Sequence, residues 1–206
     1  MSNNWLLTER QKTIDVWLRS AVNFYGFVTP RAFLIVFNRY NTPKLLKSEL
    51  MKSANKLLKQ LDRNYCIWLD AIVNTSVPGE KIEEILNSQQ GKKYYYPTET
   101  ELLKYKNPNY YERTPQTEAL FTYLCDKLGM NRFSAESFVC KLSWLHKTEE
   151  PVQKQIDLFE EYDFKMSDID QAEHLYGLMA DMSNHTRKWA NCGFTPKEIF
   201  LQYHNS

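Results

Sequence analysis

The sequence has 206 residues, of which 43% are apolar, 14% aromatic and 25% charged, the balance of a globular protein and not of a disordered or fibrous one. Its 6 glycines are too widely spread to form the GxGxxG or GxxxxGK loop of the common nucleotide-binding enzymes. No apolar run reaches the roughly 18 residues that span a bilayer, and the start lacks the pattern of a secretory leader. We therefore expect a soluble cytoplasmic protein that does not enter membranes.

Cysteines and histidines do not form a recognisable metal or catalytic pattern. None of the cysteines forms a CxxC pair, which favours free thiols; they are Cys66, Cys125, Cys140 and Cys192. His174 and His185 are three helical turns apart, about 16 Å, which is too far to share a metal ion. His204 lies further along the chain. We therefore expect no metal, no cofactor and no enzymatic activity.

The net charge of +1 hides a gradient along the chain. Residues 1–63 hold 11 Lys/Arg against 4 Asp/Glu, residues 64–132 hold 8 against 9, and residues 133–206 hold 7 against 12. A basic end of this kind indicates nucleic-acid contact, but two domains that dock through opposite fields explain it equally well.

Helix starts are marked by threonine, either before proline or three positions before Glu or Gln. A threonine side chain caps the first backbone N–H groups, and proline lacks the donor that would be unpaired there. These signals predict helices that begin near residues 9, 30, 43, 99, 115 and 196. Apolar residues at helical spacing predict further helices over 80–90, 115–128, 134–147, 151–162 and 168–190.

The segment 64–77 is rich in aromatic and β-branched residues, with Asp70 near its midpoint, and is predicted to form a β-hairpin. Three helices followed by a hairpin is the element order of a winged-helix module. We expect a mainly α protein with a small hairpin: a basic winged-helix-like domain over 1–90, a tyrosine-rich connection over 91–113, and an acidic all-α domain over 114–206.

The third predicted helix, 43–62, has two faces of opposite character. Its apolar side is made of Leu46, Leu50, Ala54, Leu57, Leu58 and Leu61. The opposite side gathers basic residues suited to phosphates: Lys52, Lys56, Lys59 and Arg63. Lys47, Ser48 and Asn55 are expected to contact a groove. The alternative is an ordinary amphipathic helix with a solvated lysine face.

The connection over 92–113 interleaves lysines and Arg113 with six tyrosines. This mixture could stack nucleic-acid bases while holding a backbone. In the other interpretation, the tyrosine rings cover apolar surface while their hydroxyls stay in water.

The segment 184–199 contains the pattern NxTRxWxxxGxTPxE, and Asn23-Phe-Tyr-Gly26, Phe37-Asn-Arg-Tyr40 and Gly91-Lys-Lys-Tyr-Tyr-Tyr-Pro97 are further points of similarity. The chain resembles a group of proteins from low-GC Gram-positive bacteria and their mobile elements, related to SEC-C motif-containing proteins. In that group a zinc-binding SEC-C tail often follows the pattern. This chain has no such cysteine cluster, so the resemblance does not imply zinc here.

The resemblance implies shared polar residues that serve an interaction: Asn184, Thr186, Arg187 and Trp189. The alternative is a lock at a helix end, in which Arg187 bonds carbonyl groups and Trp189 packs the last turn. It implies no reaction.

Taken together, these patterns predict a non-enzymatic binding protein whose first-named partner is nucleic acid. The alternative is a protein-interaction or inhibitor module, encoded by a phage or plasmid, whose acidic domain occupies a basic partner surface.

Overall fold

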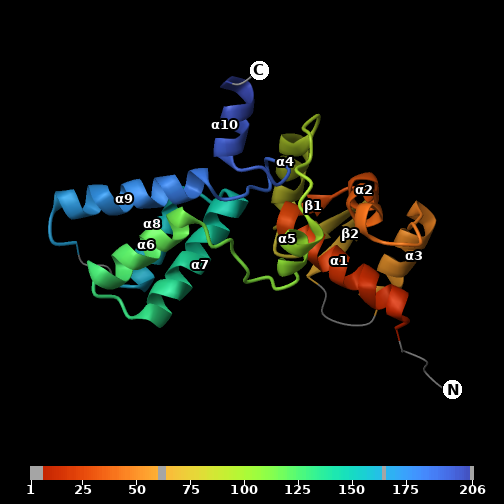
Figure 1. Cartoon of the computed structure of the whole chain (residues 1–206), viewed down its shortest axis with the longest axis horizontal. Coiled ribbons are helices and arrows are strands. Elements are labelled where there is room, and N and C mark those ends of the chain that lie inside the picture. Colours follow the sequence, from red (N-terminus) through yellow and green to blue (C-terminus); the bar gives the residue numbers. More distant parts are fainter. Residues whose placement is uncertain (1–6, 60–63, 164–165, 205–206) are drawn as a thin grey trace. The chain divides into compact units, whose positions relative to one another are not determined.

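The protein forms two compact units, Met1–Tyr110 (unit 1) and Tyr111–Ser206 (unit 2). The computed structural model describes residues 7–59, 64–163 and 166–204. The elements of unit 1 are α1 (Glu9–Tyr25), β1 (Phe27–Val28), α2 (Pro30–Tyr40), α3 (Lys47–Leu58), β2 (Tyr65–Trp68), β3 (Ala71–Asn74), α4 (Gly79–Gln89) and α5 (Glu99–Lys104) (Figure 1). Those of unit 2 are α6 (Pro115–Asp126), α7 (Arg132–Thr148), α8 (Val152–Glu161), α9 (Ile169–Asn184) and α10 (Pro196–His204).

The predicted hairpin is present, and the chain is mainly helical as expected. β2 and β3 pair antiparallel, with Trp68 opposite Ala71. A third strand, β1, pairs antiparallel with β3, so that the sheet order is β1-β3-β2. The sequence did not predict β1, because two residues are too few to show strand alternation.

Most of the threonine signals start helices where predicted. Thr8, Thr98 and Thr114 cap α1, α5 and α6 through reciprocal hydrogen bonds three residues apart. Thr29 caps α2 through the Ala32 N–H. The Thr195 hydroxyl accepts from the Glu198 N–H at 3.1 Å at the start of α10. Capping is local, which is why the sequence alone locates these starts.

The predicted start of the third helix at residue 43 is wrong. The Asn38 side chain accepts from the Leu45 N–H at 2.6 Å and donates to the Leu45 carbonyl at 3.0 Å. These bonds hold the segment before α3 in a non-helical conformation, and α3 begins at Lys47. Leu46, assigned above to the apolar face, is 67% exposed as a result.

The predicted helix over 168–190 is also too long, since α9 ends at Asn184. The Thr186 hydroxyl donates to the Met182 carbonyl at 2.8 Å. The chain then folds back, and the Lys188 N–H donates to the Phe194 carbonyl at 3.2 Å. Residues 185–195 therefore form a loop that is described with the site below.

The core of unit 1 surrounds α1, whose residues from Ile14 to Tyr25 are buried except Val16 and Arg19. The tyrosine-rich segment contributes to this core up to residue 110. Tyr105 packs edge-on against Phe24 with ring centres 4.8 Å apart, and Tyr94 packs against Tyr25 at 5.2 Å. The Tyr25 hydroxyl donates to the Tyr95 carbonyl at 2.6 Å. These tyrosine rings therefore cover apolar surface, and residues 91–110 belong to unit 1 by their packing.

The core of unit 2 lies among α6, α7, α8 and α9. Its fully buried side chains include Leu120 and Leu124 of α6 and Phe138 and Leu142 of α7. Leu175 and Met179 of α9 complete this layer. Within the described ranges, no helix is long and apolar enough to cross a membrane.

Candidate nucleic-acid interface

The helix α3 packs on one side and is open to solvent on the other. Leu50, Ala54 and Leu57 are completely buried, and α3 contacts α1, α2 and β2 (Figure 1). The predicted groove and phosphate residues of this helix are all exposed: Lys47, Ser48, Lys52, Asn55, Lys56 and Lys59. Arg63 and Leu61 lie outside the described residues. Apart from Arg63, the predicted nucleic-acid residues lie together on one exposed surface, which we call the α3 face.

The α3 face has an ordered arrangement. At 100° per residue, Ser48, Lys52, Asn55 and Lys59 fall within about 60° of one another. Lys56 and Lys47 flank this stripe on either side. Ser, Asn and Lys side chains are those that hydrogen-bond base edges in a DNA groove, and lysines at the flanks suit phosphates. One Nδ2 hydrogen of Asn55 is used within the helix, because Nδ2 donates to the Met51 carbonyl at 2.9 Å.

The lysines of the α3 face differ in their partners. The side chains of Lys52 and Lys59 form no hydrogen bond or ion pair within the described parts of the chain. Lys56 donates to Oε1 of Gln11 at 3.1 Å, a neutral partner that leaves its charge in place. Lys47 forms an ion pair with Asp70 in the turn between β2 and β3. Sequence reasoning treated Asp70 only as a turn residue, since nothing local pairs it with a lysine 23 positions away.

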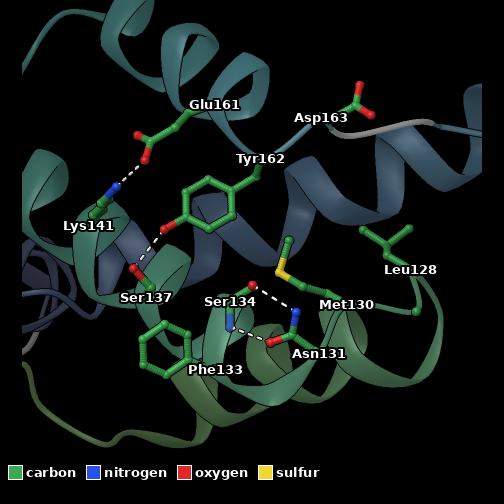
Figure 2. Close-up of a pocket in the computed structure, with 11 residues that line it drawn as sticks. Leu128, Met130, Asn131, Phe133, Ser134, Ser137, Lys141, Glu161, Tyr162 and Asp163 are labelled. Carbon is green, nitrogen blue, oxygen red and sulfur yellow. Dashed lines mark hydrogen bonds and ion pairs between the residues drawn. The ribbon is translucent and has the colours of Figure 1, made fainter.

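A cavity of about 770 Å³ lies in unit 2, between the start of α7 and the end of α8 (Figure 2). Tyr162 donates its hydroxyl to Ser137 at 2.7 Å, and Lys141 forms an ion pair with Glu161. Figure 2 also shows Asn131 joined to Ser134 at the start of α7. These polar side chains bond one another, so the cavity does not indicate a particular class of ligand. The α3 face, with its exposed lysines, does.

The resemblance residues of unit 2 hold the 185–195 loop in place. Arg187 donates to Glu112, to Glu198 and to the carbonyl of Gly193. Trp189 is buried, its backbone N–H donates to the Lys147 carbonyl at 3.1 Å, and its ring packs edge-on against the ring of Trp144 with centres 5.2 Å apart. Thr186 caps the end of α9, and Asn184 is exposed. Thr186, Arg187 and Trp189 are therefore hydrogen-bonded within unit 2. Trp189 lies in the loop and not in a helix.

Two buried basic residues near this loop have shifted pKa values. Burial lowers the pKa of Lys147 to about 8, against the opposing charge of Glu112. Burial, followed by the charge of Lys188, lowers the pKa of His146 to about 4. Burial also raises the pKa of the Cys140 thiol, which disfavours the thiolate. Sequence reasoning did not single out Glu112 or Lys147, whose burial depends on packing between distant segments.

The histidines considered above make ordinary contacts. His174 packs against the ring of Tyr123, His185 pairs with Asp181, and His204 stacks on Phe200. No group of three or more His, Cys, Asp or Glu that could hold a metal occurs within residues 7–59, 64–163 and 166–204. Comparisons of the chain with protein-family models, with curated proteins and with solved structures found no match.

Proposed function

We propose that the protein is a winged-helix-like protein that binds duplex nucleic acid through the α3 face. The arrangement of unit 1 supports this: three helices precede a hairpin, and the inner strand of the hairpin also pairs with β1, which lies between α1 and α2 in the chain. In a winged-helix module the third helix enters the groove and the hairpin forms the wing. The observation that carries the proposal is the exposed stripe of Ser48, Lys52 and Asn55 on that third helix and Lys59 at its C-cap.

The distribution of charge between the units supports the same role. Unit 1 holds 16 Lys/Arg against 10 Asp/Glu, a net charge of +6, and unit 2 holds 10 against 15, a net charge of −5. Phosphate contacts made by lysine supply most of the sequence-independent affinity for DNA. Unit 1 is therefore the unit whose field attracts a polyanion.

The test is a titration of labelled duplex DNA at several salt concentrations, with wild type and the triple variant K52Q/K56Q/K59Q. Each lost phosphate contact lowers the slope of log K against log salt by about 0.9, so the triple variant should flatten the slope by about 3. A matched control is K127Q/K154Q/K197Q, which removes the same charge from exposed lysines outside both α3 and residues 92–113. The control should keep most of the wild-type slope. Undetectable wild-type binding at about 50 mM salt would overturn the proposal.

The alternative function is a protein-interaction module, favoured by the net charge of −5 on unit 2. If the lysines of α3 face acidic residues of unit 2 in solution, the triple variant should lose thermal stability at low salt. The melting temperature of the wild type should then fall by a similar amount at high salt, since salt screens exposed charge pairs over about 10 Å. If the lysines face nucleic acid, the melting temperatures of wild type and variant should agree at both salt concentrations.

A further inference from the structure

The turn between β2 and β3 carries a negative charge that lies against the α3 face. Pairing of Trp68 with Ala71 leaves Leu69 and Asp70 as the two turn residues. The Asp70 carboxylate binds the ammonium group of Lys47, the first residue of α3. Both side chains are more than half exposed, so the pair is accessible to solvent and to an anion from outside.

This pair changes what the α3 face offers to nucleic acid. Lys52 and Lys59 lack a partner among the described residues, and Lys56 is bonded to a neutral amide. Lys47 is the lysine of this face whose charge a carboxylate cancels. It is also at the helix N-terminus, where the backbone dipole would otherwise add to the attraction of a phosphate. The Asp70 carboxylate thus makes with Lys47 the kind of ion pair that a phosphate oxygen would make.

We propose that Asp70 is a specificity-determining residue that competes with phosphate for Lys47 and so weakens sequence-independent binding of nucleic acid. This inference rests on the proposed function of the α3 face. Phosphate contacts raise affinity for every sequence alike, whereas groove contacts such as those expected of Ser48 and Asn55 distinguish sequences. Removing one phosphate contact therefore increases the share of binding that depends on sequence.

The test is the substitution D70N in the same duplex titration. Asparagine keeps the size of the side chain and is itself a common turn residue. Release of Lys47 should add one phosphate contact, which steepens the slope of log K against log salt by about 0.9 and tightens binding about eightfold at about 0.1 M salt. The matched control is E83Q, which removes one exposed carboxylate from α4 and should leave the slope unchanged.

A second variant identifies the cause of any gain. In K47Q/D70N there is no ammonium group to release, so the slope should return to that of the wild type. If K47Q/D70N still binds DNA more tightly and with a steeper slope than the wild type, Asp70 does not act by competing for Lys47. If the wild type binds DNA but D70N and E83Q show the same slope of log K against log salt, the inference about Asp70 is wrong and the proposed function still stands. Undetectable binding by wild type and D70N would overturn both.

Discussion

The Nε of Arg187 donates to Oε1 of Glu112 at 3.0 Å and joins residues 75 positions apart in the chain. Nη1 of the same guanidinium donates to the Gly193 carbonyl at 3.0 Å and to Oε2 of Glu198 at 3.1 Å. The Arg187 side chain is only 10% exposed. One buried guanidinium therefore links the start of unit 2, the loop after α9 and the first turn of α10.

We predict that R187Q destabilises unit 2 by about 2 kcal/mol, because the variant loses charged hydrogen bonds and leaves the partly buried carboxylates of Glu112 and Glu198 uncompensated. Hydrogen exchange of amides in α7 and α9 measures this change within unit 2 alone. The control is K154Q, which removes the same charge from an exposed position of α8 and should change stability by about 0.5 kcal/mol or less. Equal exchange in the two variants would show that the Arg187 links contribute no net stability.

The buried ammonium group of Lys147 should make unit 2 more stable as pH rises. Burial lowers the pKa of Lys147 from 10.5 to about 8 in the folded protein. Between these two pH values the unfolded chain binds more protons at this residue than the folded chain does. The free energy of unfolding therefore rises with pH in this window, by at most about 1.4 kcal/mol per pH unit.

The measurement is urea denaturation of wild type and K147M from about pH 7.5 to about pH 9.5. The difference between wild type and K147M should grow with pH in favour of the wild type. Burial, reinforced by Glu136, raises the pKa of Tyr111, so this phenol stays protonated over the same range. Parallel stability curves for the two proteins would contradict a lowered pKa for Lys147.

The turn residue Leu69 is 81% exposed and has a φ of 52°, a left-handed conformation that is unfavourable for a leucine. Asparagine tolerates this conformation, so L69N should stabilise unit 1 by about 0.5 to 1 kcal/mol. The control is L69A, which removes the same exposed apolar side chain but keeps a residue that is disfavoured at this φ. Thermal melting of both variants measures the difference, and a melting temperature for L69N no higher than that of L69A would rule out relief of backbone strain.

Short-range interactions explain why much of the helical structure is predictable from the sequence. Thr8 with Gln11, and Thr195 with Glu198, close hydrogen bonds across three residues. The hairpin is likewise local, because its two strands are joined by a turn at Leu69 and Asp70. The alternation of buried and basic residues along 47–59 also predicts the exposed lysine face from sequence alone.

Tertiary packing decided the features that depend on distant partners. The helix α3 begins at Lys47 and not at the predicted residue 43, because Asn38 on α2 hydrogen-bonds the backbone of Leu45. The pairing of Lys47 with Asp70 depends on the fold placing the hairpin turn beside the N-terminus of α3. The periodicity of an amphipathic helix predicts from the sequence which side chains are exposed. It does not predict their partners, because these lie on chain segments that come together only when the protein folds.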